Sequence, residues 1–544
     1  MKRLMMVAMA ASSLAAMAEF KMDRSVMGDK YWSVWNDSVQ AKIDADIEAN
    51  RKADAEFAIE APAGTEVKVE QLTHAFYFGA HIFNYNQLGK KEWNDKYKAL
   101  YDAEKGLFNS GTVAFYWRTL EKYAYAPRFA ESYEDTENFW NACVQPKEQD
   151  HWRRPAPDPV IAHLKATGCR IHGHPLVWGN NEWHTPTWLW DDFVPEREKR
   201  ALEAATGVTL PRRDPKIGMG LKDPPRCWEW SGAWAKIYAK LSEAEIAALV
   251  PSFVKAQRFF TEKRIREIGE RYGSRVDSWD VVNESATDWA KGAKRTWPEG
   301  ESAAVNRLPL TKSDYGMMPA NFAYEAVRLA RKYMKPDAWL NVNEYNMQAF
   351  PGQIADLKAH GADFDVVGSQ MHLFNPAESV KIARGEFTAE TRQKVTPEGI
   401  AAVFADIARA SGGKKVHLSE ITITAPDTSM RGQMVQAVIM RNCYRAWFAV
   451  KDMTGITWWN VVDDCGAPGE PSISGLFTRD MRPKTAYFAM DDLVNREWKT
   501  RTRVKATAQA DGRVSVAFRG FRGRYRLSWK DAQGKEHSQF AEVK

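Results

Sequence analysis

Eight strand-like runs that alternate with helical segments constrain the fold of this 544-residue chain more than any other feature. The runs are rich in Val, Ile and aromatic residues, and they cover residues 76–81, 112–117, 170–178, 276–284, 338–345, 365–373, 416–423 and 456–462. Amphipathic helical patterns, such as those at 322–333 and 400–410, lie between them. Strands that alternate with helices form a parallel sheet, and eight repeats predict a closed (β/α)8 barrel, the TIM barrel of the α/β class.

Two shorter segments flank the barrel, which we place at residues 76–498. Residues 19–75 contain a helical pattern and then two alternating runs, 56–60 and 66–70, on either side of a Pro-Ala-Gly turn. This pattern predicts an N-terminal helix followed by a β-hairpin. Residues 501–544 alternate again, with Gly between the runs, and predict a small C-terminal β module that is either a packing appendage or a sugar-binding module.

The connection at about residues 179–240 is too long for a simple turn between a strand and a helix. It contains Trp183, Trp188, Trp190, Trp228, Trp230 and Trp234. Long loops in compact domains are usually lids or extra walls of a binding site, although an insertion with its own small core explains the same residues. The sequence leaves both interpretations open.

The first 18 residues resemble a secretory signal peptide. Lys2 and Arg3 precede an apolar stretch at residues 4–16, and Ala16-Met17-Ala18 fits the small-residue cleavage pattern. We therefore expect an exported protein, either periplasmic or extracellular. The sequence after this segment contains no run of about 18 apolar residues, so we expect no membrane partner.

Composition limits the classes of partner. The net charge of +6, from 76 basic and 70 acidic residues, is weak for this length, and no basic block is interleaved with aromatic residues, so we expect no nucleic-acid partner. The 22 tryptophans fit a carbohydrate cleft, because indole faces stack on sugar rings, although a large core also uses tryptophan. The five cysteines, Cys143, Cys169, Cys227, Cys443 and Cys465, have no CxxC spacing and allow one or two disulfides of open pairing. The oligomeric state stays open.

Two glutamates carry most of the functional signal. Glu284 ends the run at 276–284, and Glu420 lies near the end of the run at 416–423. A carboxylate is costly to bury, so a pair of them on two buried strands needs a functional reason. The carboxyl ends of the strands form the active rim of a TIM barrel, and paired carboxylates at such a rim are the machinery of glycoside hydrolysis.

Further motifs follow one another along the barrel. They are HGHPLVW at 172–178, WDVVNE at 279–284, NVNEYN at 341–346, GSQMH at 368–372, LSEI at 418–421, GITWW at 455–459 and RPKTAY at 482–487. In this order they resemble glycoside hydrolase family 10, the retaining endo-β-1,4-xylanases, over about residues 76–498. The resemblance implies a TIM barrel that hydrolyses a polysaccharide or oligosaccharide substrate and needs no cofactor and no metal.

The resemblance also implies a role for individual side chains. Glu284 would be the general acid and base, and Glu420 the nucleophile of a double displacement. Asn283 would hydrogen-bond the 2-hydroxyl of the sugar, and His372 would hydrogen-bond the nucleophile. The other substrate-binding residues that it implies are His174, Trp178, Gln370, Tyr345 and Trp459, with Trp459 rather than Trp458 facing the sugar and Asn343 beside Tyr345 on the leaving-group side.

The second strand departs from the family pattern, which offers Glu, Asn and Lys before a Trp to bind the sugar one step beyond the cleavage position. This chain has TVAFYW at 112–117, with Tyr116 in place of the Lys, and DDCGAP at 463–468 in place of a further Trp. Loss of hydrogen-bonding groups alters specificity strongly. Xylan is therefore the first candidate substrate, and a different β-linked glycan or a glycoside with a non-sugar group is its rival.

Three other functions stay open. The insertion at 179–240 could wall off one end of the cleft and give exo action on a different β-glycoside. A barrel that only binds glycans would keep the fold without the chemistry, although both glutamates are present. His172 and His174 have the spacing of two metal ligands on one strand face, but metal-dependent amidohydrolases place such a pair on the first strand and not on the third.

Overall fold

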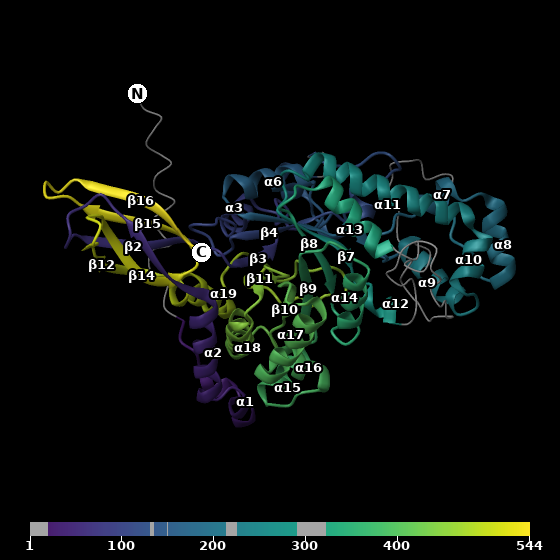
Figure 1. Cartoon of the computed structure of the whole chain (residues 1–544). Helices are drawn as coiled ribbons and strands as arrows, with labels where there is room; N and C mark the ends of the chain where they lie inside the picture. Colours follow the sequence, from purple (N-terminus) through teal and green to yellow (C-terminus); the bar gives the residue numbers. More distant parts are fainter. Residues whose placement is uncertain (1–19, 131–134, 150, 214–225, 291–321) are drawn as a thin grey trace.

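The structure, a computed structural model, describes residues 20–130, 135–149, 151–213, 226–290 and 322–544. The expected leader at residues 1–18 lies outside these ranges. Figure 1 shows a central barrel, antiparallel sheets on one side of it, and a group of short helices on the other side.

A parallel sheet closes into the barrel. Its strands are β3 (Tyr77–His81), β4 (Ser110–Ala114), β5 (Arg170–His174), β6 (Val177–Trp178), β7 (Ser278–Asn283), β8 (Trp339–Glu344), β9 (Val366–Leu373), β10 (Lys415–Ile423) and β11 (Met453–Trp458). The order β5-β4-β3-β11-β10-β9-β8-β7-β6 closes because β5 also pairs with β7. Since β5 and β6 are two pieces of one predicted run, the described residues give the eight strand positions of a TIM barrel, and this prediction is confirmed.

Two β-bulges lie in the strands that carry the candidate glutamates. In β7 the register with β8 shifts between Asp280 and Val282, and in β10 the register with β9 shifts between Leu418 and Glu420. A bulge adds one unpaired residue and turns the side chains that follow it, and bulges are common beside active sites. As a result, Glu420 lies opposite Gln370 of β9.

Helices surround the barrel near the predicted positions. They are α3 (Lys91–Ala99), α4 (Trp117–Leu120), α5 (Glu137–Ala142), η3 (Pro146–Glu148), α6 (Pro157–Ala166), α11 (Pro251–Tyr272), α12 (Ala286–Ala290), α13 (Phe322–Tyr333), α14 (Phe350–Ala359), α15 (Pro376–Ala383), α16 (Ala389–Val395), α17 (Pro397–Ser411), α18 (Met430–Ala449), α19 (Thr485–Asp492) and η5 (Leu493–Glu497). Their apolar faces and the outer faces of the strands form the main core, where Trp279, Trp447 and Trp458 are fully buried.

The segments before and after the barrel form one β-sandwich together (Figure 1). After η1 (Arg24–Val26), α1 (Asp29–Val34) and α2 (Asp37–Arg51), the strands are β1 (Lys52–Ala58), β2 (Glu66–His74), β12 (Arg501–Lys505), β13 (Thr507–Ala508), β14 (Val514–Phe521), β15 (Gly523–Lys530) and β16 (Glu536–Val543). The sheets have the orders β1-β14-β13 and β12-β2-β15-β16. The predicted N-terminal hairpin is wrong, because β1 pairs with β14 and β2 pairs with β12 and β15.

The insertion at 179–240 contains its own core. Its helices are α7 (Trp188–Phe193), α8 (Glu196–Thr206) and α9 (Arg226–Tyr238), and α10 (Glu243–Leu249) follows them. Trp190 stacks on Trp230 with ring centroids 4.6 Å apart, and Trp188 and Trp234 are buried in the same cluster. The side chain of Trp228 lies outside the described residues. Most of the tryptophan in this segment therefore fills a core, whereas Trp183 lines the cleft described below.

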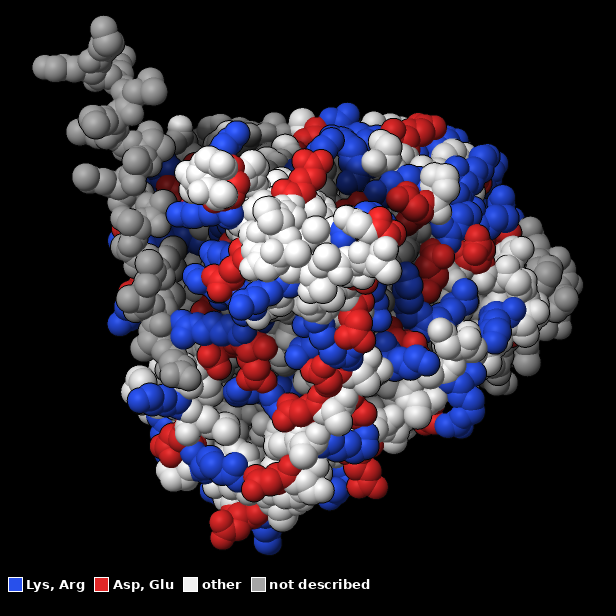
Figure 2. Space-filling model, turned by 60° about the vertical axis from the view of Figure 1, so that its left-hand side comes forward, with Lys and Arg blue, Asp and Glu red and all other residues white. Residues whose placement is uncertain are grey.

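The surface carries charges of both signs. On the face that Figure 2 shows, Lys and Arg side chains are interspersed with Asp and Glu side chains. Within the described ranges, no helix is both long enough and apolar enough to span a bilayer. Cys143, Cys169, Cys443 and Cys465 are free thiols, and the side chain of Cys227 lies outside the described residues.

Candidate active site

A cleft of about 530 Å³ opens at the carboxyl ends of the barrel strands. It is lined by most of the residues that the sequence singles out, namely His174, Trp178, Glu284, Tyr345, Gln370, His372, Glu420 and Trp459. Asn283 does not line the cleft. Its side chain is buried beneath the cleft, and its Oδ1 accepts a hydrogen bond from Asn343 Nδ2 at 2.8 Å. Side chains that lie far apart in the sequence therefore meet at one end of the barrel.

Gln370 brings the two candidate glutamates together. Its Nε2 lies 3.1 Å from Oε1 of Glu284 and 2.9 Å from Oε1 of Glu420. Two oxygen atoms that contact one nitrogen at these distances lie at most about 6 Å apart. The two carboxyl groups therefore face one small volume of the cleft.

Both carboxyl groups hold protons more tightly than ordinary glutamates do. Burial and the neighbouring charge of Glu420 raise the pKa of Glu284 to about 7. Burial raises the pKa of Glu420 to about 7 as well. Because the two groups are so close, they titrate as a pair, and ionisation of one carboxyl makes the other retain its proton. The hydrogen-bond donors around each group decide which carboxyl is ionised first.

The donors favour a negative charge on Glu420. In addition to the Gln370 amide, Nδ2 of Asn343 donates to Oε1 of Glu420 at 3.0 Å. His372 Nε2 lies 3.4 Å from Oε2, and His174 Nε2 lies 3.8 Å from Oε1. Burial lowers the pKa of His372 to about 4, so this ring is neutral at pH 7 and acts as a hydrogen-bond partner rather than as a cation. Hydrogen bonds to the ionised form favour that form, so Glu420 carries the charge and the second carboxyl carries the proton.

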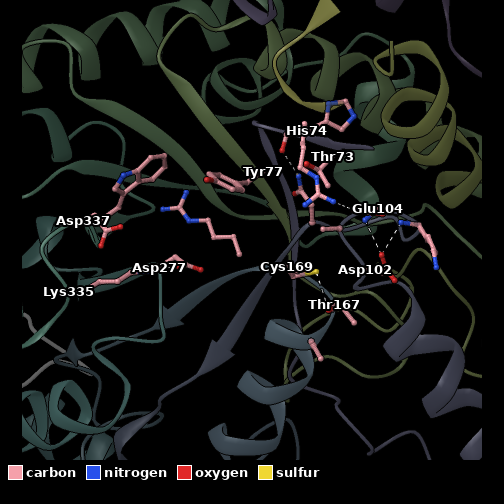
Figure 3. A pocket seen from close by; sticks show the side chains of 18 residues that line it. Thr73, His74, Tyr77, Asp102, Glu104, Thr167, Cys169, Asp277, Lys335 and Asp337 are labelled. Carbon is pink, nitrogen blue, oxygen red and sulfur yellow. Dashed lines mark hydrogen bonds and ion pairs between the residues drawn. The ribbon is translucent and has the colours of Figure 1, made fainter. Parts of the chain in front are cut away.

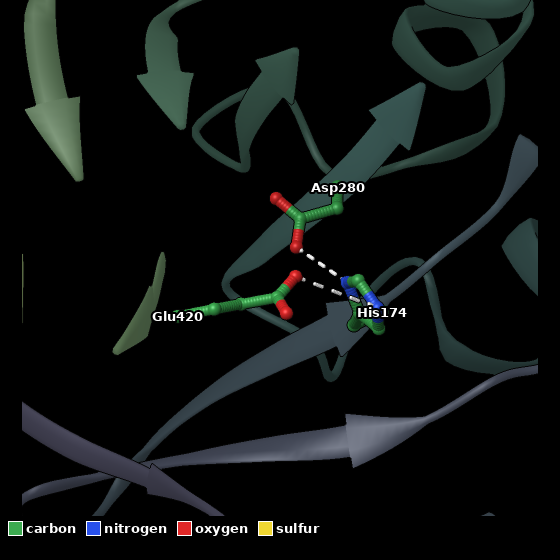
Figure 4. A group of neighbouring side chains, drawn as sticks. All are labelled: His174, Asp280 and Glu420. Atoms are coloured by element: carbon green, nitrogen blue, oxygen red, sulfur yellow. Dashed lines mark hydrogen bonds and ion pairs between the residues drawn. The ribbon is translucent and has the colours of Figure 1, made fainter. Parts of the chain in front are cut away.

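Asp280 supports the histidines of the HGH motif. Its Oδ2 lies 2.9 Å from Nε2 of His172 and 2.8 Å from Nδ1 of His174. His174, Asp280 and Glu420 face one another (Figure 4), with one ligand atom of each within 4.8 Å of the others, as in a metal site. The two histidine rings already occupy both lone pairs of Asp280 Oδ2. Hydrogen bonding therefore accounts for this cluster, and the cluster fixes the orientation of His174 beside Glu420.

Glu344 is a third buried carboxyl group, and it holds the loop that carries Glu284. Its Oε2 accepts a hydrogen bond from the N–H of Ala286 at 2.6 Å, and its Oε1 accepts from the N–H groups of Tyr345 and Asn346 at 2.8 and 2.9 Å. Glu284 itself has a φ of 54°, a left-handed conformation that is costly for a residue other than glycine. Glu344 thus stabilises the strained backbone at Glu284, because it accepts a hydrogen bond from the N–H of Ala286, two residues after Glu284.

Replacement of Glu344 by glutamine is expected to lower kcat/KM by about 10- to 100-fold, because small displacements of a catalytic group cost about this much. Burial raises the pKa of Glu344 to about 7, and above that pH its negative charge favours the protonated form of Glu284, so its removal should shift the basic limb of the pH–rate profile to lower pH. The measurement is kcat/KM against pH for wild type, Glu344→Gln and Glu344→Asp. A lower rate with an unmoved basic limb would contradict the positioning role.

The aromatic residues of the eighth strand divide as predicted. Trp459 lines the cleft, whereas Trp458 packs against Tyr444 of α18 with ring centroids 6.5 Å apart. Tyr345 lies at the rim of the cleft and is 50% exposed. The prediction that Asn343 lies beside Tyr345 on the cleft surface is wrong, because its side chain is buried against Glu420.

The site contains residues that the sequence analysis did not select. Two of them, Asp280 and Glu344, could have been found, because they are acidic residues inside apolar runs and their burial needs partners. The others carry no distinct signal in the sequence. Arg153, Arg154 and Glu470 line the cleft from connecting segments, whose paths periodicity does not predict.

A larger cavity of about 820 Å³ lies at the opposite end of the barrel (Figure 3). Arg170 covers the aromatic faces there, with its guanidinium 4.1 Å from the ring centre of Tyr77 and 3.7 Å from that of Trp339. Asp277 pairs with Lys335 at 2.6 Å. The amino ends of TIM-barrel strands contribute to stability rather than to chemistry, so the smaller cleft is the candidate active site.

Comparison with known proteins agrees with this choice. The profile of glycosyl hydrolase family 10 matches residues 250–493, a range that contains Glu284, Gln370, Glu420 and Trp459. Residues 250–493 therefore belong to glycosyl hydrolase family 10. The strands β3 to β6, the residue Tyr116 and the insertion lie before the family 10 segment.

The relatives of the family 10 segment are distant. Endo-1,4-beta-xylanase C of Paenibacillus barcinonensis is 26% identical over 241 residues, which are 42% of this chain and 21% of that protein. Exoglucanase XynX of Acetivibrio thermocellus is 24% identical over 238 residues, which are 41% of this chain and 18% of that protein. The chain thus spans only about a fifth of the length of these relatives. The crystal structure of xylanase 10B from Thermotoga maritima is 16% identical, with a TM-score of 0.46 over 78% of this chain and 96% of that one.

The carboxyl groups of Glu284 and Glu420 are expected to lower the stability of the fold at high pH. A carboxyl group whose pKa rises from 4.5 to about 7 on folding stabilises the protein below pH 4.5, and this stabilisation is lost as the pH rises through 7. Glu284→Gln and Glu420→Gln should each therefore raise the free energy of unfolding at pH 8, by about 2 kcal/mol. The difference from wild type should shrink towards pH 4.5. Thermal unfolding at both pH values measures it, and variants less stable than wild type at pH 8 would contradict the pKa assignment.

Proposed function

We propose that the chain is a retaining glycoside hydrolase that cleaves β-1,4-linked xylan or a related β-glycan. The observation that carries this proposal is the contact of one nitrogen, Gln370 Nε2, with carboxylate oxygens of both Glu284 and Glu420. Retaining enzymes place their carboxyl groups about 5–5.5 Å apart, and inverting enzymes about 6.5–9.5 Å apart. The upper limit of about 6 Å between the two oxygens supports the retaining class.

In the first step, Glu420 attacks the anomeric carbon while Glu284 protonates the departing glycosidic oxygen. The donors around Glu420 keep it ionised for attack, and burial keeps Glu284 protonated near pH 7. In the second step, Glu284 takes a proton from water, and the water displaces Glu420 from the sugar. Two inversions at one carbon return the original β configuration.

The choice of substrate rests on the relatives and on the cleft. The relatives named above are an endo-1,4-beta-xylanase and an exoglucanase, so β-1,4-linked glycans are the first class to test. Trp459 and Trp178 supply ring faces on which a pyranose can stack.

Exo action is the second candidate, and residues of the insertion favour it. Asn180, Glu182 and Trp183 line the cleft, so the insertion forms part of its wall. A wall that blocks one end of the cleft would admit only the end of a glycan chain.

A panel of substrates tests the proposal. The purified chain is incubated with aryl β-xylosides, aryl β-glucosides, xylo-oligosaccharides and polymeric xylan, with and without a chelator. We expect cleavage of at least one β-glycoside, at a rate that the chelator does not change. Lack of cleavage across the panel would favour a glycan-binding barrel, and loss of activity with the chelator would favour a metal-dependent hydrolase. The sizes of the products from polymeric xylan distinguish endo from exo action.

A further inference from the structure

One wall of the cleft carries Arg154, a cation that stacks on an aromatic ring. Arg154 lines the cleft with its guanidinium 3.6 Å from the ring centre of Tyr116. Its Nη1 donates a hydrogen bond to the carbonyl of Arg153 at 2.8 Å, but Arg154 forms no ion pair with any residue that the structure describes. Burial lowers the pKa of Arg154 to about 10, so the side chain is still charged at pH 7.

The neighbouring residue, Arg153, differs from Arg154 because a carboxylate compensates its charge. Arg153 Nη1 lies 3.5 Å from Oε2 of Glu470, and its Nη2 donates to Asn460 Oδ1 at 3.1 Å. Arg153 has a φ of 59°, a left-handed conformation. Both arginines line the cleft, but Arg153 is buried and pairs with a carboxylate, whereas Arg154 is only partly buried and stacks on an aromatic ring.

Arg154 is connected to the proposed nucleophile through the rings of Tyr116 and His174. The ring of Tyr116 contacts that of His174 with centroids 5.5 Å apart, and Nε2 of His174 lies 3.8 Å from Oε1 of Glu420. Tyr116 therefore supplies the aromatic face of this wall, and Arg154, from another segment, supplies a planar guanidinium.

We propose that Arg154 binds an anionic substituent of the glycan, either the carboxylate of a uronic acid or a sulfate ester. The inference rests on the proposed function and specifies its substrate class. A partly buried cation that forms no ion pair with a described carboxylate carries a desolvation cost, and a ligand anion would offset this cost. The planar fork of N–H donors on a guanidinium matches the oxygens of either anion, with two parallel hydrogen bonds.

Among the described residues, Glu470 is the carboxylate whose charge acts on Arg154, but it forms no ion pair with it. Glu470 is nearby, but it already accepts hydrogen bonds from Asn460 Nδ2 at 3.0 Å and from the N–H of Ala467 at 2.8 Å, and it faces Arg153. The other cleft-lining carboxylates outside the catalytic pair, such as Glu378 of α15, come from different segments. Negative charge elsewhere in the cleft would direct an anionic substituent towards Arg154.

Equilibrium binding to the full chain tests this inference apart from hydrolysis. The chain carries Glu284→Gln to slow turnover, and calorimetry measures Kd for three ligands: a neutral xylo-oligosaccharide, the same oligosaccharide with a glucuronic acid branch, and an O-sulfated form. The variants added to it are Arg154→Met, Arg154→Lys and, as a control, Arg409→Met, which removes an exposed arginine paired with Asp406 on α17.

We expect one anionic ligand to bind about 10- to 100-fold more tightly than the neutral one, as for a hydrogen-bonded charge. Arg154→Met should abolish this ratio, Arg154→Lys should keep part of it, and Arg409→Met should keep all of it. The tighter anionic ligand identifies the group as carboxylate or sulfate. Equal binding of all three ligands, or a ratio that survives in Arg154→Met, would overturn the inference.

Failure of the inference and failure of the proposed function give different results. If the wild-type chain cleaves neutral xylo-oligosaccharides and shows no anionic preference, only the inference fails. If it cleaves none of the three ligands but the binding ratio depends on Arg154, the anion site stands and the hydrolase proposal fails.

Discussion

Replacement of Glu420 by alanine is expected to lower kcat on a xylo-oligosaccharide by about 10⁴-fold or more, because no covalent glycosyl-enzyme can then form. Steady-state kinetics on the purified variant measures the loss. The matched control is Glu398→Ala, which removes an exposed glutamate at the start of α17, outside the cleft.

Chemical rescue separates loss of a nucleophile from loss of the fold. The alanine variant leaves space beside the anomeric carbon, so azide at high concentration should attack an activated aryl β-xyloside in place of Glu420. A single displacement inverts the centre, and the product should be the α-glycosyl azide. Activity close to wild type without azide, or a β-glycosyl azide with it, would contradict the nucleophile role.

Replacement of Glu284 by alanine is expected to affect substrates according to their leaving group. A sugar hydroxyl departs only when it is protonated, so kcat/KM on xylo-oligosaccharides should fall by about 10²- to 10⁴-fold. A dinitrophenyl xyloside departs without protonation, and its first step should change far less. The variant should also lose the basic limb of the pH–rate profile, because burial and the charge of Glu420 raise the pKa of Glu284 to about 7 in the wild type.

Kinetics on a series of aryl β-xylosides provides the measurement. A plot of log(kcat/KM) against the pKa of the leaving phenol should be steeper for Glu284→Ala than for wild type. Equal losses across the series, with the basic limb intact, would mean that Glu284 is not the general acid.

Much of the barrel could be predicted from sequence because buried parallel strands are short apolar runs between amphipathic helices. The helix at residues 322–333 and the strand that ends near Glu284 follow from this periodicity alone. The hairpin prediction failed for a physical reason. Each of β1 and β2 has an alternating pattern, but alternation states only that a strand buries one face, and the partners come from residues more than 400 positions later.

The details of the site depend on contacts that periodicity does not encode. The bulges between Asp280 and Val282 and between Leu418 and Glu420 break the two-residue alternation where side-chain direction matters most. The sequence also misplaces Asn343, which is buried against Glu420 rather than at the rim. Arg154 comes from a connecting segment, and only the path of the chain brings it over Tyr116.

The anomeric configuration of the first product tests most directly whether the two carboxyl groups act across one sugar by double displacement. Proton NMR of a xylo-oligosaccharide digest, recorded before mutarotation, distinguishes the two anomers of the new reducing end. A β-anomer that appears first and then equilibrates is the expected result. An α-anomer that appears first would contradict the assignment of Glu420 as nucleophile.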